Sequence, residues 1–294
     1  LGKDFSATQK LVAGSKIKAE TAFLNCYDSR WSIQWQPHHK DFAYEDHFLH
    51  YYRPLAEQNI PMDILSADEP LAGYKLVIAP ALLILNKQRI THLKEYVDSG
   101  GHLVLTVRCG MKDEFNALLP ERQPGRLGEL CGVEVEDYYA LQNPIPVIGD
   151  GWMGESRIWA ERIRILDSAN TQVLATYGEC NGWLDGHPAI TRHSYGRGMV
   201  TFIGVYLDEM SQTRLVQATT QLAGVQPVML TPVGVEACRR VSQIGEEIII
   251  VINHLPTEQR VLLPWQAHEQ LTSMAVDGEL VLEPYGVAVL THGS

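Results

Sequence analysis

The chain has 294 residues, with 24 Lys and Arg against 35 Asp and Glu, which gives a formal net charge of −11 at neutral pH. The sequence contains no basic cluster that would offset this negative charge. A polyanion would therefore be repelled, and we expect no nucleic-acid partner. At 45% hydrophobic residues the chain can bury a proper core, and its length suggests two domains.

The first half of the chain alternates apolar runs with segments of helical spacing. The apolar run 19–25 predicts a buried strand, and a loop rich in Trp, Gln, Pro and His follows it from 27 to 40. Helical spacing then relates Tyr44, Phe48, Tyr52 and Leu55, and Pro54 should kink or shorten this helix. Further elements are expected as strands at 62–65, 75–80 and 102–107 and a helix at 87–99. Strands that alternate with helices predict parallel βαβ units.

The second half is less regular and then changes character. A short helix is expected at 126–130, strands at 172–177, 189–194 and 199–206, and a helix at 208–223 that ends at Gly224. After Pro227 the pattern becomes short strands split by turns, at 233–240, 247–253, 260–263, 279–282 and 287–291. Such a tail predicts a small β-sandwich. We therefore expect one domain over 1–226 and a second over 227–294.

The five cysteines are odd in number, widely spaced and without a CxxC pair. This usage argues against a disulfide framework and a structural zinc site, and it fits a reducing compartment such as a bacterial cytoplasm. No apolar run reaches the roughly 18 residues of a membrane span, and no signal peptide is seen. The chain opens at Leu1 without a Met, within a segment of helical character. We therefore expect it to be a fragment of a longer protein.

Cys109 stands on a turn directly after the predicted strand 102–107, where an α/β sheet would hold a catalytic nucleophile. A nucleophile elbow needs small residues two places before and after the nucleophile, whereas Val107 and Met111 occupy those places. No candidate histidine base brings its own carboxylate, since the nearest echo of His-x-Glu is His187-Pro-Ala189. We expect Cys109 to be structural rather than catalytic.

The other candidate sites are expected to be structural. His47 and His50 are three residues apart on the expected helix, but no further ligand set accompanies them, so no metal or cofactor is expected. The glycines of Gly196-Arg-Gly198 precede a strand and predict a hairpin turn rather than a phosphate loop. Asp113 and Glu114 are expected to cap a helix that starts near Phe115.

Tyr27, Arg30, Trp31 and Trp35 lie in the segment that follows the first strand. Ligands of open α/β sheets bind at the carboxyl ends of parallel strands. Aromatic faces beside Arg and Gln suit either a sugar or a protein partner. These four residues are the candidate substrate-rim or interface group, with packing against the domain's own core as the alternative.

Taken together, the segments resemble the middle and C-terminal domains of glycoside hydrolase family 42 β-galactosidases. The similar pieces follow one another in the order and spacing of that family, and they are Tyr51-Tyr-Arg-Pro-Leu55, Ile60-Pro-Met-Asp63, Gly73-Tyr-Lys-Leu-Val-Ile-Ala-Pro80, Gly100-Gly101, Arg108-Cys-Gly-Met-Lys-Asp-Glu114, Leu127-Gly-Glu-Leu-Cys-Gly132, Tyr195-Gly-Arg-Gly198, Gly234-Val-Glu236, Ile252-Asn-His254 and Pro284-Tyr-Gly-Val287. The chain departs from the family at Pro54 and at Cys109, where serine is commoner.

The resemblance implies an α/β domain with an open, mainly parallel sheet of the flavodoxin or class I glutamine amidotransferase-like type, followed by a small all-β sandwich. It also implies a homotrimer and a parent enzyme that hydrolyses terminal β-galactosides with retention. The family's two catalytic glutamates lie in a (β/α)8 barrel, the acid/base directly after an asparagine, and this chain contains no Asn-Glu dipeptide. We therefore expect no catalytic residue here, and contact with the galactoside only through the barrel.

Two alternatives remain open on the sequence. One is a free-standing binding or regulatory module with an amidotransferase-like fold. The other is an active cysteine hydrolase that uses Cys109.

Overall fold

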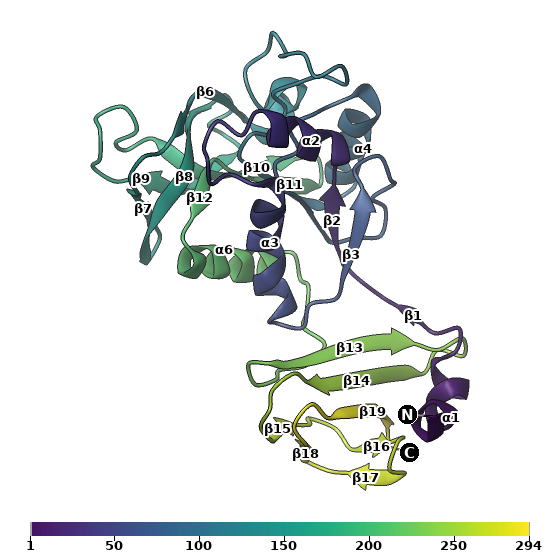
Figure 1. The fold of residues 1–294 in the computed structure, drawn as a ribbon. Helices are drawn as coiled ribbons and strands as arrows, with labels where there is room; N and C mark the ends of the chain where they lie inside the picture. The colour runs from purple at the N-terminus through teal and green to yellow at the C-terminus, as the bar shows by residue number, and fades with distance from the viewer. Residues whose placement is uncertain (1, 294) are drawn as a thin grey trace. The chain divides into compact units, whose positions relative to one another are not determined.

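The computed structural model describes residues 2–293, and the chain divides into two compact units. An α/β unit comprises residues 21–52 and 63–225. A β unit comprises the residues up to Glu20 together with 53–62 and 226–294. Figure 1 shows the elements of both units along the chain. The segment 53–62 thus belongs to the same unit as the C-terminal strands.

One half of the large sheet in the α/β unit is parallel. Its strands lie in the order β3 (Met62–Ser66), β2 (Thr21–Asn25), β4 (Leu76–Ala79), β5 (His102–Thr106) and β11 (Gly198–Ile203). The pairs β2–β4, β4–β5 and β5–β11 are all parallel. Strands β4 and β5 are buried at every position, because helices cover both faces of this part of the sheet.

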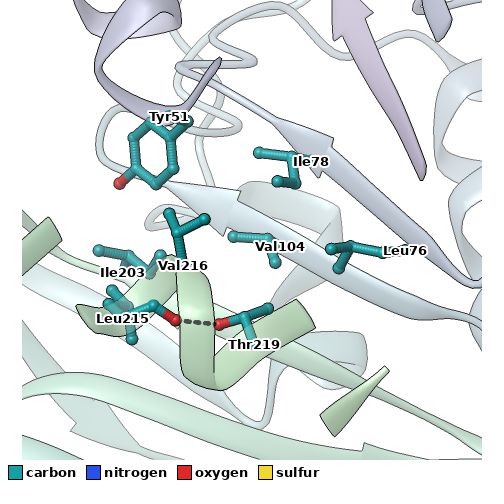
Figure 2. A pocket seen from close by; sticks show the side chains of 8 residues that line it. All are labelled: Tyr51, Leu76, Ile78, Val104, Ile203, Leu215, Val216 and Thr219. Atoms are coloured by element: carbon teal, nitrogen blue, oxygen red, sulfur yellow. Dashed lines mark hydrogen bonds between the residues drawn. The ribbon is translucent and has the colours of Figure 1, made fainter. Parts of the chain in front are cut away.

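The alternation of side chains along each strand shows which helices cover which face. Val77 and Leu103 join a core cluster with Leu93 of α4 (Lys87–Asp98) and Leu130 of α5 (Gly128–Cys131). Their neighbours point to the opposite face, toward α3 (Tyr44–Ala56) and α6 (Glu209–Leu222). Figure 2 shows the small apolar pocket on that face, lined by Tyr51, Leu76, Ile78, Val104, Ile203, Leu215, Val216 and Thr219. With no charged side chain in its lining, this pocket is a packing gap rather than a place for chemistry.

The other half of the sheet is antiparallel, so the expectation of a mainly parallel sheet is wrong and the sheet is mixed. Its strands continue as β10 (Pro188–Tyr195), β9 (Thr171–Tyr177), β7 (Ile145–Gly149), β8 (Trp152–Ile165) and β12 (Val205–Leu207), with β6 (Val133–Ala140) paired to β8. Short turns join β7 to β8 and β10 to β11, and such hairpins can only make antiparallel pairs. The hairpin predicted at Gly196-Arg-Gly198 is confirmed, since Tyr195 pairs with Gly198.

The β unit is a sandwich, as predicted. Its larger sheet has the order β1 (Lys16–Ile17), β13 (Val235–Val241), β14 (Glu247–Asn253), β19 (Val287–His292), β16 (Ala267–Glu269) and β17 (Met274–Val276), and the smaller pairs β15 (Gln259–Leu262) with β18 (Glu279–Leu282). Alternate side chains of both sheets, among them Val251, Val261 and Leu290, form one core. The helical segment that was expected at the start of the chain forms the helix α1 (Gly2–Val12).

Asn59 ties the segment 53–62 into this unit. Its side-chain Oδ1 accepts the Ala237 backbone N–H at 2.8 Å. Its Nδ2 donates to the Met229 carbonyl at 3.2 Å and to Thr231 Oγ1 at 2.7 Å. Asn59 has a φ of 56°, a left-handed conformation that Asn adopts more readily than other residues with side chains. One residue thus satisfies several buried polar groups of the sandwich.

Candidate functional site at the strand ends

The segments that follow β2, β4 and β5 gather at one edge of the sheet, because the carboxyl ends of parallel strands meet there. The first of them was expected to be a loop, and this is wrong: Tyr27–Trp35 forms the helix α2. Cys26 is its N-cap, with Sγ accepting the Ser29 backbone N–H at 3.4 Å. Asp28 in the first turn adds a favourable negative charge.

The exposed face of α2 carries the four residues singled out in the sequence. Trp31 and Trp35 are 55% and 85% exposed. The Tyr27 and Trp31 rings are in contact at 5.8 Å between centroids, and the Arg30 guanidinium lies 5.9 Å from the Tyr27 centroid. Arg30 also pairs with Glu45 at 2.5 Å. The structure therefore brings Tyr27, Arg30 and Trp31 together on the helix surface, with Trp35 one turn further along.

Arg89 fixes the start of α2. Its Nε and Nη2 donate to the two carboxylate oxygens of Asp68 at 2.8 and 2.9 Å, and Nη2 also donates to Asp28 at 3.0 Å. Arg89 Nη1 donates to the Ile84 carbonyl at 3.2 Å. The Arg89 guanidinium holds the pKa of the Asp68 carboxyl below its usual value. A largely buried guanidinium thus joins the first turn of α2 to α4 and to the segment after β3.

Arg108 fixes the chain after α2 and is almost completely buried. Its Nη1 and Nη2 donate to the carbonyls of Pro37 and Gln36 at 2.9 and 2.8 Å. The guanidinium carbon lies 4.8 Å from the Phe42 ring centroid and 5.0 Å from that of Trp159. Such a planar cation is well suited to a site between two rings. Arg108 therefore holds the 36–37 backbone against the core.

Glu161 on β8 is the buried carboxylate beside Arg108. Its Oε1 accepts the Arg108 backbone N–H at 2.7 Å and Trp159 Nε1–H at 3.0 Å. Burial raises the pKa of Glu161 to about 7, and burial lowers the pKa of Arg108 to about 10. Arg108 has a φ of 67°, a conformation that is costly for a residue with a side chain. The hydrogen bond from its backbone N–H to the Glu161 carboxylate helps to hold this conformation.

Lys112 is a buried ammonium whose hydrogen-bond partners are neutral oxygens. Its Nζ donates to Gln36 Oε1 at 2.6 Å, Asn116 Oδ1 at 2.9 Å and Ser32 Oγ at 3.1 Å. Burial lowers the pKa of this amine. The three bonds use all three donors of the ammonium and attach the last turn of α2 to the turn that follows Met111.

Sequence reasoning did not find Glu161 or the role of Lys112. Glu161 lies on β8, which was not predicted, and no motif includes it. Lys112 and Arg108 both stand in the Arg108–Glu114 segment that carried the family resemblance, but the pattern gave no sign of their partners at Ser32, Gln36 and Pro37. The paired segments are about seventy to eighty positions apart in the sequence, so no local signal could connect them.

Cys109 is fully buried in the core cluster that includes Leu82, Leu127 and Cys131. Burial raises the pKa of its thiol well above the usual value, which opposes the thiolate form that a nucleophile needs. Val107 and Met111 are buried in a separate core cluster with Trp159. The geometry therefore suits a structural cysteine under the strand-end turn.

We predict that iodoacetamide leaves Cys109 unmodified in the native chain, because its sulfur is out of contact with solvent. Cys180 is exposed and serves as the matched control, although its own pKa is raised to about 11. Peptide mass mapping after timed labelling measures both sites. Native Cys109 that reacts as fast as Cys180 would show that the turn opens or that the thiol is activated.

The remaining candidate residues make hydrogen bonds within the described chain. His47 is buried and its Nε2 lies 2.8 Å from Thr106 Oγ1. Asp113 and Glu114 were expected to cap a helix that starts near Phe115, and this is wrong, because no helix begins there. Asp113 Oδ1 accepts the backbone N–H groups of Phe115 and Ala117 at 2.9 Å each, and the segment forms a turn because these bonds close it locally. Within residues 2–293, no group of three or more His, Cys, Asp or Glu side chains is placed to hold a metal ion. The helices over the same residues include none with the length and hydrophobicity of a membrane span.

Comparison with known protein families shows which family the chain belongs to. Residues 19–226 match the family model described as the β-galactosidase trimerisation domain, and residues 234–292 match that of the β-galactosidase C-terminal domain. The chain belongs to the β-galactosidase trimerisation-domain family. The family resemblance seen in the sequence is thereby confirmed.

Similar proteins are longer than this chain. The chain is 30% identical to the β-galactosidase BglY of Alicyclobacillus acidocaldarius over 290 residues, covering 95% of this chain and 42% of that protein. It is 30% identical to the β-galactosidase LacZ of Lactobacillus acidophilus, covering 89% of this chain and 39% of that protein. The chain thus spans about two fifths of the length of the curated relatives it matches.

Solved β-galactosidase structures share the fold of this chain and are also longer than it. The β-galactosidase of Bacillus circulans sp. alkalophilus superimposes with a TM-score of 0.93 at 25% identity, covering all of this chain and 44% of that one. The enzyme of the haloarchaeon Halorubrum lacusprofundi gives a TM-score of 0.84 at 28% identity, with 98% and 42% covered. The trimerisation domain, its mixed α/β sheet and the sandwich after it therefore occur together in known β-galactosidases.

Proposed function

We propose that this chain is the non-catalytic oligomerisation and C-terminal part of a β-galactosidase. The observation that carries the proposal is the match of both successive domains to β-galactosidase domain families, over about two fifths of the length of enzymes that carry that name. The complete protein would hydrolyse terminal β-D-galactosides with retention, through two glutamates of a (β/α)8 barrel that lies outside these residues. The buried Cys109, and the hydrogen bonds by which Arg108 and Lys112 hold neighbouring segments, support a structural role for the chain.

The finer fold assignment is an amidotransferase-like sheet of the flavodoxin type. Its support is the order of the parallel strands, in which the second, first, third, fourth and fifth in chain order are neighbours. That is the doubly wound order of flavodoxin-like sheets. In such a sheet the turn after β5 would be the place of the amidotransferase nucleophile, and here it holds Cys109 in the core. The domain would thus keep the amidotransferase-like fold, without its catalytic activity, and use it for assembly.

The direct test of this function is an activity measurement on the complete protein and on the 294-residue chain. The complete protein is expected to cleave 4-nitrophenyl β-D-galactoside and to release the β-anomer first, as followed by proton NMR. The chain alone is expected to release no galactose. Cleavage by the chain alone, or a complete protein inactive on β-galactosides, would refute the proposal.

We further propose that the chain associates as a homotrimer, and that Tyr27, Arg30, Trp31 and Trp35 lie at the subunit interface or at the substrate rim beside it. The support is their exposure at a strand-end edge, on a helix that three buried cations hold in place. Exposed Trp and Tyr on a rigid element are typical of interface hot spots.

Replacing Trp31 and Trp35 together by Ala is expected to weaken trimer formation, or to raise KM for the galactoside, by at least about tenfold. Their side chains are mostly solvent-exposed in the chain, so its free energy of unfolding should change by less than about 1 kcal/mol. Sedimentation velocity and steady-state kinetics on the complete protein measure the two effects. Unchanged kinetics together with an unchanged trimer would remove these residues from the site.

A further inference from the structure

His38 lies directly against the buried guanidinium of Arg108. Its Nδ1 is 3.0 Å from Arg108 Nη2 and 2.8 Å from the Gln36 carbonyl oxygen, which accepts from the same Nη2. The imidazole also stands edge-on to the rings of Trp159 and Tyr138, with 5.9 and 6.0 Å between ring centroids. A titratable side chain is thereby held at hydrogen-bond distance from a permanent positive charge.

The charge of His38 decides whether this contact is favourable. In either neutral tautomer the ring is uncharged, and a ring nitrogen without a proton can accept from Arg108. An imidazolium carries a proton on both nitrogens, so it cannot accept, and two like charges then repel each other at this distance. Burial and the charge of Arg108 both lower the pKa of His38. The contact is therefore complete above the ordinary histidine pKa of about 6.5 and weakens as the pH falls below it.

The carboxylates near this contact already have partners. The other charged and titratable groups around it, from its own segment, α3, the turn after β5, β6 and β8, are His39, Asp41, His47, Lys112, Tyr138 and Glu161. Asp41 Oδ2 lies 3.9 Å from His39 Nδ1, and Glu161 Oε1 accepts the Arg108 backbone N–H and Trp159 Nε1–H. A proton on His38 thus adds to the positive charge of Arg108 rather than completing an ion pair.

The segment 36–42, which joins α2 to α3, is anchored by Arg108 rather than by a strand or a helix. The carbonyls of Gln36 and Pro37 accept from its guanidinium at 2.8 and 2.9 Å, and Lys112 holds the Gln36 side chain. His38 has a φ of 63°, a conformation that is costly for a residue with a side chain. A strained connection with one main anchor can open locally while the surrounding helices and strands stay folded.

We infer that His38 and Arg108 form an acid-sensitive latch, in which a proton on His38 releases the segment 36–42 from Arg108 and loosens the end of α2 that carries Trp35. The imidazole gains one proton, and no other covalent bond of the chain changes. Protonation of histidine is a common way for a protein to respond to pH in this range. The inference is independent of the proposed β-galactosidase activity and of the trimer, because every group in it belongs to one chain.

Amide hydrogen exchange of the 294-residue chain at pH 5 and pH 8, measured by mass spectrometry on peptides that cover 36–42 and corrected for the intrinsic pH dependence of exchange, tests the latch. In the wild type, the corrected exchange of this segment is expected to be about fivefold faster at pH 5 than at pH 8. His38→Gln keeps an acceptor for Arg108 but cannot be protonated, so its corrected exchange should be the same at both pH values. His254→Gln is the matched control, because His254 pairs with Glu236 in the β unit, and it should keep the wild-type response.

An NMR titration of the His38 ring in the wild-type chain is a second measurement, which does not depend on the folding of a variant. Its midpoint is expected below the ordinary value of 6.5. A midpoint at or above that value, or wild-type exchange that is the same at both pH values, would overturn the latch. Faster exchange at pH 5 that persists in His38→Gln would assign the response to another group and would equally overturn the role of His38. Circular dichroism verifies that each variant is folded.

Discussion

Replacing Arg108 by Met is expected to lower the free energy of unfolding of the trimerisation domain by about 4 kcal/mol. The substitution keeps much of the apolar volume between Phe42 and Trp159 but removes the donors to the Gln36 and Pro37 carbonyls. It also leaves the Glu161 carboxylate buried without the neighbouring positive charge that favours its ionised form. The loss is large because two buried carbonyls lose a charged donor at the same time as the positive charge near Glu161 is removed.

Urea unfolding followed by circular dichroism measures this loss. Arg164→Met is the matched control, because Arg164 pairs with Glu134 at the surface and is half exposed. Exposed ion pairs contribute about 0–1 kcal/mol, so the control should change stability very little. If Arg108→Met unfolds within 1 kcal/mol of the wild type, Arg108 does not hold the segment after α2 in the way described.

Replacing Glu161 by Gln is expected to change the pH dependence of stability. Burial raises the pKa of Glu161 from 4.5 to about 7 in the folded chain. A carboxyl whose folded pKa lies above its unfolded value binds its proton more tightly when folded. Its contribution to stability is therefore most favourable below pH 4.5, falls as the pH rises toward 7, and is constant above that. The total change across this window is about 3 kcal/mol.

The comparison of Glu161→Gln with the wild type isolates this group. Gln keeps an oxygen that can accept from the Arg108 N–H and from Trp159 Nε1–H, but it cannot ionise. The stability of the variant relative to the wild type should therefore rise by about 3 kcal/mol between pH 4.5 and pH 8. Other carboxyls, such as Asp68 with its lowered pKa, affect both proteins alike and cancel. Urea midpoints that shift in parallel across this range would mean that Glu161 does not titrate as described.

The sequence predicted those elements whose signal is local. Strands β4 and β5 are continuous apolar runs because both of their faces are buried. The sandwich strands β14 and β19 were found from their short runs between turns. In contrast, β8 mixes Arg and Glu with apolar residues over Trp152–Ile165, since part of it pairs at the surface with β6. The β10–β11 hairpin was predicted, but without β6, β7 and β8 the rest of the antiparallel half of the sheet could not be foreseen.

The candidate site was given the wrong local conformation, and its role stays a prediction. The aromatic group 27–35 was expected on a loop, and nine residues with little apolar periodicity are marginal as an isolated helix. Tertiary contacts from Arg89, Arg108 and Lys112 stabilise α2, and no local pattern contains them. Cys109 shows the opposite case, because the bulky neighbours Val107 and Met111 gave a local reason to expect a buried thiol.

The mass of the 294-residue chain in solution tests the central claim most directly. Sedimentation equilibrium between about 1 and 100 µM is expected to show association to three copies of the 32.9 kDa chain. That result would mean that the trimerisation domain assembles through its own surface. A mass of one chain at every concentration would contradict the account, since the residues assigned to assembly would then not assemble.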